Sequence, residues 1–132
     1  MSLKVLIADP DWGFTQSTVR YLESKAHLVV SQPHADQAMA TASHWNPDLV
    51  IVSEELSETG IIEDLYELDP RPAVLLVGWM DRYDRVWRAW QRGGDELLMK
   101  PVFSSEELQA ALVASLESAA SGTPVRQVAE SA

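Results

Sequence analysis

The sequence predicts an α/β fold, a (βα)5 three-layer sandwich with a central five-stranded parallel sheet. The chain has 132 residues, the size of one ordinary domain. It contains five short apolar segments that lack the polar–apolar alternation of a half-exposed strand, which is typical of parallel strands covered on both faces. Segments with helical spacing separate them. Strands that alternate with helices through right-handed crossovers form an open, doubly wound sheet.

Each element follows from its local sequence. In chain order the apolar runs LKVLIA, LVVS, DLVIVS, AVLLVG and ELLM predict strands at 3–8, 28–31, 48–53, 73–78 and 96–99. The pair Gly93-Gly94 is expected to end the fourth helix, because glycine adopts left-handed backbone readily. Ser104 followed by Glu107 forms a capping box and marks the start of the fifth helix. The expected helices span Phe14–Lys25, Ala35–Trp45, Ile61–Leu68, Arg82–Arg92 and Ser104–Ala119.

Composition and charge limit what the chain can be. With 46% hydrophobic and 23% charged residues it is globular, and we expect one domain over 1–120 and a flexible tail over 121–132. No apolar run reaches the roughly 18 residues of a membrane span, and no export signal is recognisable. The absence of cysteine excludes disulfides and zinc–thiolate sites, which favours a cytoplasmic protein. A net charge of -10 argues against nucleic acid and membrane partners.

Polar residues follow the predicted strands at one edge of the sheet. In open α/β sheets the crevice beyond the carboxyl ends of the strands holds the functional site. The first strand ends at Asp9-Pro10-Asp11, the third at Ser53-Glu54-Glu55, the fourth at Val77 and the fifth at Lys100. The candidate pocket therefore consists of Asp9, Asp11, Ser53, Glu55, Val77 and Lys100.

The segments VLIADPD, PDLVIVSEEL, RPAVLLVG and GGDELLMKPV, in this order and spacing, resemble the receiver domain of bacterial response regulators, the CheY-like family. The resemblance spans about residues 3–118 and implies the flavodoxin-like strand order 2-1-3-4-5. It also implies a role in two-component signalling or a phosphorelay. In that family a histidine kinase donates phosphate to an aspartate that ends the third strand, with Mg2+ held by acids after the first.

The resemblance is incomplete at the phosphorylation site. Asp9, Lys100 and Pro101 match the family's pattern. The family's second metal-binding acid, its phosphoacceptor aspartate, its hydroxyl residue and its switching aromatic are replaced here by Pro10, Ser53, Val77 and Leu97. We therefore expect an atypical receiver, a pseudo-receiver that lacks the phosphoacceptor and has no enzyme activity.

The substitutions also predict how the pocket is filled. We expect Lys100 to form a salt bridge with Asp9, and Ser53 to hydrogen-bond a backbone group or Lys100. No cofactor is expected, because Mg2+ requires several oxygen ligands and only Asp9 and Asp11 are weak candidates. The alternative is a phosphoacceptor receiver that uses Ser53 or a displaced carboxylate with Mg2+, although a serine nucleophile needs an adjacent base.

Function is then expected from a surface on the fourth helix. Arg85, Arg88 and Arg92 share one face at helical spacing, and Trp87 and Trp90 lie three residues apart. Arginine and tryptophan are enriched in interface hot spots, and the resemblance implies a partner surface formed by helix 4, strand 5 and helix 5. We expect a protein partner or a homodimer there, with a histidine kinase or a fused output domain as candidates.

Two further observations bear on this surface. The segment 54–69 contains seven acids and no Lys or Arg, and such opposed charges can steer association. The alternative is that the arginines only form a solvated helix face, as helical charge stripes usually do. Trp12 and Trp45 are expected to be packing residues and not ligand contacts.

Overall fold

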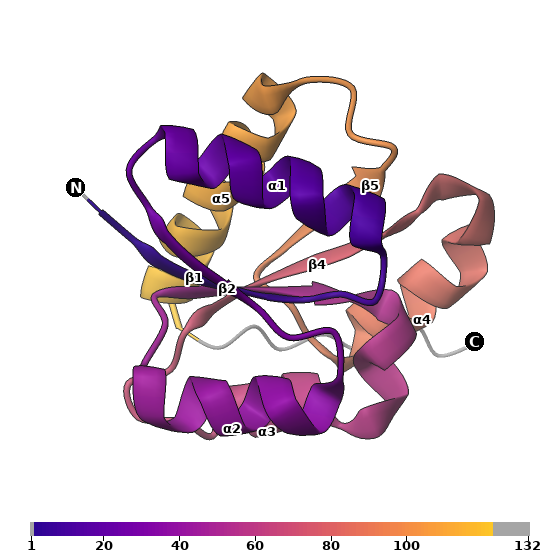
Figure 1. The fold of residues 1–132 in the computed structure, drawn as a ribbon. Coiled ribbons are helices and arrows are strands. Elements are labelled where there is room, and N and C mark those ends of the chain that lie inside the picture. Colours follow the sequence, from indigo (N-terminus) through magenta and orange to yellow (C-terminus); the bar gives the residue numbers. More distant parts are fainter. Residues whose placement is uncertain (1, 123–132) are drawn as a thin grey trace.

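The protein forms a three-layer α/β sandwich around one parallel sheet (Figure 1). The structure is a computed structural model that describes residues 2–122. Five strands pair in parallel in the order β2-β1-β3-β4-β5. This confirms the predicted fold class and strand order. The strands are β1 (Lys4–Ala8), β2 (Leu28–Ser31), β3 (Leu49–Ser53), β4 (Ala73–Trp79) and β5 (Glu96–Lys100).

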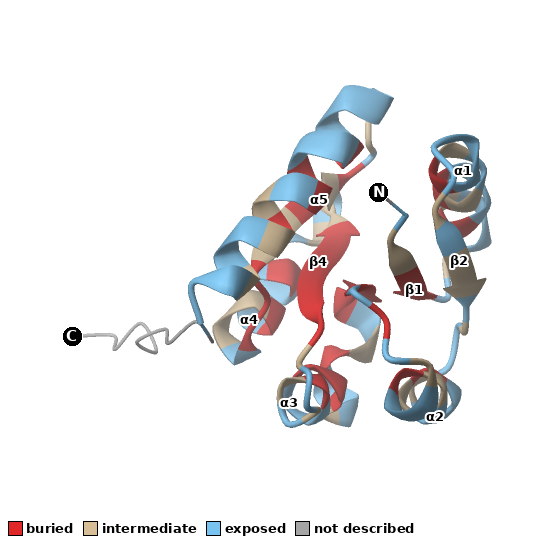
Figure 2. Ribbon diagram, turned by 90° about the vertical axis from the view of Figure 1, so that its left-hand side faces the viewer, coloured by how far each residue is buried: buried red, intermediate tan, exposed pale blue. Residues whose placement is uncertain are grey.

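The helices cover both faces of the sheet. Helices α1 and α5 contribute Leu22, Leu108 and Leu112 to one core cluster, whereas α2, α3 and α4 contribute to a second cluster on the opposite face. Alternate strand residues point into the two clusters, so the central strands are buried on both sides (Figure 2). The helices are α1 (Trp12–Ser24), α2 (Ala35–Trp45), α3 (Ile61–Tyr66), α4 (Tyr83–Arg92) and α5 (Ser105–Ala120).

Helix ends follow their caps. Helix α1 begins two residues earlier than predicted, because the Asp11 side chain accepts a hydrogen bond from the Phe14 N–H and caps the helix at its first turn. The predicted cap of α5 is present: Ser104 Oγ accepts from the Glu107 N–H, and the Glu107 carboxylate accepts from the Phe103 N–H. Gly94, at φ +116°, lies against the Trp90 ring, so a side chain there would be strained and crowded.

The connection between β3 and α3 differs most from the sequence prediction. Residues Glu54–Thr59 form a 3-10 helix, η1, and a second short 3-10 turn, η2 (Met80–Arg82), precedes α4. Helix α3 (Ile61–Tyr66) begins where it was predicted but ends two residues before the predicted 68. Within residues 2–122 no helix is long and apolar enough to cross a membrane. Most of the predicted tail at 121–132 lies outside the described residues.

Two predictions about tryptophan packing have different outcomes. Trp45 packs against the second core cluster, with the Lys4 ammonium over its ring, as predicted. The prediction for Trp12 is wrong, because this side chain is 75% exposed. It occupies the first position of α1, directly after its N-cap, and the buried residues of this helix are Thr15, Thr18 and Leu22.

Candidate functional site

The carboxyl ends of β1, β3, β4 and β5 meet at one edge of the sheet. Ser53 pairs in register with Val77, and Trp79 pairs with Lys100. Asp9 directly follows β1, the neighbour of β3 on the other side. Asp9, Ser53, Val77 and Lys100 are all at least nine-tenths buried. Four of the six predicted pocket residues are therefore buried at this edge, although they do not all interact.

An ion pair fills this region. Lys100 Nζ lies 2.7 Å from Asp9 Oδ2 and 3.2 Å from Asp11 Oδ2. Lys100 is 1% exposed and Asp9 is 3% exposed. The other oxygen of Asp9 accepts from the Asp11 N–H at 2.8 Å, and the other oxygen of Asp11 caps α1. The predicted salt bridge between Lys100 and Asp9 is thus confirmed, and Asp11 shares the ammonium.

Two aromatic rings enclose the lysine. Its ammonium lies 4.4 Å from the centroid of the Phe14 ring and 5.5 Å from that of Trp79, which adds a cation–π contribution to the ion pair. The sequence analysis missed both rings. The available signal was the position of Trp79, two residues beyond Val77 on the same face of β4.

The two carboxylates have opposite pKa shifts. Burial raises the pKa of Asp9 above its ordinary value, and the hydrogen bonds from Lys100 and the Asp11 N–H offset this only in part. For Asp11, desolvation acts in the same direction but is outweighed. The hydrogen bonds from the Phe14 N–H and Lys100 hold the pKa of Asp11 below its ordinary value. The partly exposed Asp11 is therefore the more acidic of the pair.

Ser53 has a structural bond of its own. Its Oγ accepts a hydrogen bond from the Glu55 N–H at 3.1 Å and caps η1. Ser53 is 1% exposed, and its register partner Val77 is fully buried. The prediction that Ser53 bonds a backbone group is confirmed. Glu55, which we expected in the pocket, instead pairs with Arg82 at 3.2 Å.

The pocket residues do not fit a Mg2+ ion. Both oxygens of Asp9 and both oxygens of Asp11 already accept hydrogen bonds, two of them from the Lys100 ammonium. Within residues 2–122 no three His, Asp or Glu side chains are grouped to hold a metal. A divalent cation beside Asp9 and Asp11 would have to displace a buried positive charge.

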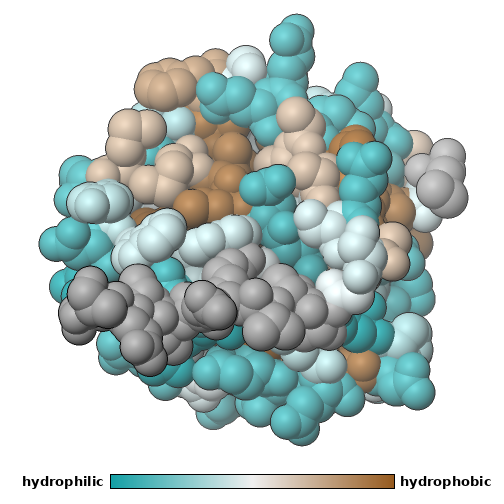
Figure 3. Space-filling view, turned by 180° about the vertical axis from the view of Figure 1, so that it is seen from behind, coloured by the Kyte–Doolittle hydropathy of each residue, from teal (hydrophilic) through white to brown (hydrophobic). Residues whose placement is uncertain are grey.

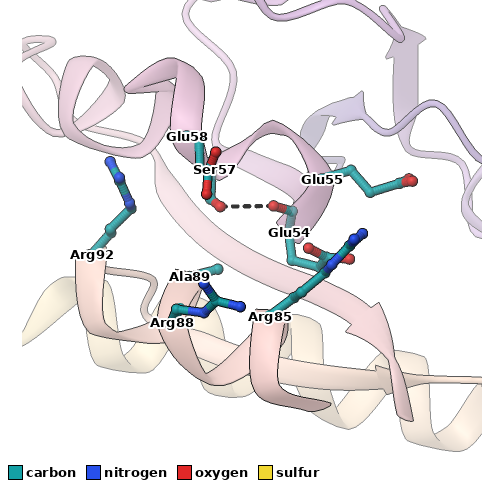
Figure 4. A pocket seen from close by; sticks show the side chains of 8 residues that line it. All are labelled: Glu54, Glu55, Ser57, Glu58, Arg85, Arg88, Ala89 and Arg92. Atoms are coloured by element: carbon teal, nitrogen blue, oxygen red, sulfur yellow. Dashed lines mark hydrogen bonds between the residues drawn. The ribbon is translucent and has the colours of Figure 1, made fainter. Parts of the chain in front are cut away.

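The arginines of α4 face η1 across a second cavity. Figure 4 shows Arg85, Arg88 and Arg92 on the side of α4 and the acidic residues of η1 on the other side, with the Arg85 side chain extending toward Glu54 and Glu55. The cavity has a volume of about 700 Å³, within the range of small-molecule sites. Two ion pairs connect the same segments: Arg82 to Glu55, and Arg92 to Glu63 at 3.3 Å. Its charged lining consists of Glu54, Glu55, Glu58, Arg85, Arg88 and Arg92.

The arginines and the tryptophans of the predicted partner surface lie on different sides of α4. At 3.6 residues per turn, Trp87 and Trp90 lie roughly opposite the arginine face. Trp87 is 51% exposed, whereas the Trp90 ring packs on Gly94 and the core. Figure 3 looks onto the side of the molecule formed by α4 and α5, where apolar side chains, brown and tan, gather over part of the surface.

Comparisons with known proteins agree with this fold. No protein-family model and no curated protein matches the chain. Among solved structures, NtrX from Brucella abortus, in complex with ADP, superposes with a TM-score of 0.78 at 19% identity, covering 92% of this chain. This chain spans only 28% of the NtrX chain.

Two matches are to single receiver domains. A signal receiver domain from Vibrio parahaemolyticus has a TM-score of 0.74 at 15% identity and covers 91% of this chain and 94% of its own. A CheY-like response regulator receiver domain protein from Methanospirillum hungatei has a TM-score of 0.70 at 21% identity, covering 92% of this chain and all of its own. The protein therefore has the fold of response-regulator receiver domains.

Proposed function

We propose that this chain is a receiver domain of two-component signalling that acts as a protein-interaction module without aspartyl phosphorylation. The observation that carries the proposal is the state of position 53. A buried serine ends β3 there, its hydroxyl caps η1, and the neighbouring lysine is held by Asp9 and Asp11. The pocket is thus occupied by its own side chains.

The chemistry of the pocket supports this proposal. A carboxylate is ionised at neutral pH and can attack phosphorus directly, whereas a serine hydroxyl needs a base within hydrogen-bond reach. The bond made by Ser53 Oγ among the described residues is to a backbone N–H. The Val77 side chain offers no hydroxyl to a phosphoryl group. We accordingly propose neither phosphotransfer nor another enzyme activity for the domain.

Mass spectrometry tests the phosphorylation half of the proposal. The purified chain would be incubated with acetyl phosphate and Mg2+ and its intact mass compared with that of a Ser53→Ala variant. We expect no added phosphoryl group on either protein. A gain of one phosphoryl group on the wild type alone would identify Ser53 as an acceptor. A gain on both proteins would identify a displaced carboxylate. Either result would overturn the proposal.

The face formed by α4, β5 and α5 is our proposed partner surface. Trp87 is half exposed on α4, and β5 is an edge strand of the sheet between α4 and α5. A half-exposed tryptophan is a common interface anchor. We propose that this face docks a second copy of the chain, a histidine kinase or an output domain.

Sedimentation velocity tests the surface, with Trp12 as a matched control. Trp12 is even more exposed than Trp87 but lies at the start of α1. We expect Trp87→Ala to weaken self-association by about tenfold or more, whereas Trp12→Ala leaves it unchanged. A dimer that survives Trp87→Ala would refute this use of the face. A wild-type chain that stays monomeric at millimolar concentration would exclude the second copy as the partner.

A further inference from the structure

We propose that the cavity between η1 and α4 binds a small ligand that carries an anionic group and paired N–H donors, with a guanine nucleotide as the best-fitting class. This site is separate from the degenerate phosphorylation pocket and from the α4, β5 and α5 face. Its two sides come from different segments: the glutamates belong to η1 and the arginines to α4 (Figure 4).

The arginines supply an anion site. Arg82 and Arg92 are held by Glu55 and Glu63. Arg85 and Arg88 also line the cavity, yet within residues 2–122 neither has a carboxylate oxygen within 4.0 Å. Two guanidinium groups one helical turn apart, facing the same cavity, form a fork that suits a phosphate.

The opposite wall supplies an acceptor. Glu54 is only 5% exposed, and its Oε1 is buried without a hydrogen-bond partner among the described residues. The nearest cation, Arg82 Nη1, is 3.8 Å away, beyond hydrogen-bond distance. Buried polar atoms nearly always have a hydrogen-bond partner, so the unpaired Glu54 Oε1 indicates a donor that comes from outside the described residues. A carboxylate can accept two parallel N–H bonds, one on each oxygen.

The balance of charges narrows the ligand class. Three glutamates and three arginines line the cavity. A simple anion would be repelled by the acidic wall and a simple cation by the basic wall. A ligand with a phosphate at one end and adjacent N–H donors at the other satisfies both. Guanine offers such a donor pair in its ring N–H and exocyclic amine, whereas adenine offers only its amine.

The acidic wall is held in place before any ligand arrives. The Ser57 hydroxyl donates to the Glu54 carbonyl at 2.7 Å. The Glu54 side chain lies against Gly78, where an added Cβ would fall 2.8 Å from Glu54 Cγ and 2.3 Å from Val86 Cγ2. This close approach, which only glycine permits, fixes the distance between η1 and α4. The cavity is therefore preformed, which lowers the ordering cost of binding.

Titration calorimetry with three probes tests the proposal. Guanosine monophosphate, adenosine monophosphate and inorganic phosphate would each be added to the wild type and to three variants: Glu54→Gln, Arg88→Gln and Arg20→Gln. Arg20 is an exposed arginine on α1 and does not line the cavity, so it serves as the control. Amide chemical shifts from two-dimensional NMR would report whether η1 and α4 are the segments contacted.

The expected results distinguish the contribution of the glutamate wall to binding from that of the arginine wall. Guanosine monophosphate should bind more tightly than adenosine monophosphate. Glu54→Gln should weaken the binding of guanosine monophosphate by about tenfold or more. The same substitution should strengthen the binding of inorganic phosphate, because a negative charge is removed from the cavity. Arg88→Gln should weaken the binding of all three probes, whereas Arg20→Gln should leave the binding of all three unchanged. The proposal is overturned if no probe binds, if the two nucleotides bind equally, or if binding does not respond to Glu54→Gln.

Discussion

Replacement of Lys100 by methionine is expected to lower the free energy of unfolding by about 3–5 kcal/mol at neutral pH. The lysine side chain is 2% exposed and the Asp9 side chain is fully buried. Methionine fills the space of the lysine stem but leaves the Asp9 carboxylate with a single hydrogen bond, from the Asp11 N–H at 2.8 Å. The cation–π contacts to Phe14 and Trp79 are lost as well.

The loss of stability caused by Lys100→Met should depend on pH in a defined direction. Burial already raises the pKa of Asp9 above its ordinary value of 3.8 in the folded protein. Without the ammonium, we expect this pKa to rise further. When the pKa of a carboxyl group is higher in the folded protein than in the unfolded chain, its contribution to stability is complete below the pKa of the unfolded chain. That contribution is lost as the pH rises through the pKa of the folded protein. The defect of Lys100→Met should therefore be largest near neutral pH and shrink on acidification.

Urea unfolding followed by tryptophan fluorescence provides the measurement. Asp9→Asn and the double variant with Lys100→Met complete a double-mutant cycle. We expect a coupling free energy of about 2–3 kcal/mol between the two positions, with the double variant more stable than Lys100→Met alone. If Lys100→Met costs less than about 1 kcal/mol at pH 7, the magnitude of an exposed pair, the ion pair does not fill the pocket as described.

Three further predictions concern η1 and its neighbours. Burial, and then the adjacent Glu55, raise the pKa of Glu54. Glu54→Gln should therefore be more stable than the wild type at pH 7, by about 1 kcal/mol, with the gain vanishing toward pH 4. Gly78→Ala should destabilise the fold by about 1–3 kcal/mol, because its Cβ would clash with Val86. Ser53→Ala removes the cap of η1 and should cost about 1 kcal/mol. The same urea assay measures all three, and changes of opposite sign would contradict them.

The sequence was sufficient for the fold because its local signals agree with one another. Buried strands appear as uninterrupted apolar runs, and the cap at Ser104 and the Gly93-Gly94 pair mark where helices start and end. The salt bridge between Lys100 and Asp9 was also predictable, since all strands of a parallel sheet bring their carboxyl ends to one edge.

Features that depend on side-chain direction were not predictable. The opposed charges of 54–69 and of α4 suggested a surface that steers partners, but the fold sets η1 beside α4, so that Arg82 and Arg92 pair within the molecule. The burial of Glu54 depends on the small residue Gly78 on a neighbouring strand. The exposure of Trp12 depends on where α1 begins, which a residue type alone does not reveal.

The contact between η1 and α4 has a consequence for the electric field of the whole molecule. A sequence with acids gathered in one segment and arginines in another suggests a large dipole moment, but the fold places these segments side by side, where the fields of opposite charges partly offset each other. Charges farther away than the Debye length of about 8 Å are largely screened at physiological salt. Within that distance an approaching molecule meets a protein of net charge -10, so overall acidity governs the encounter, and the arginines are recognised only at close contact.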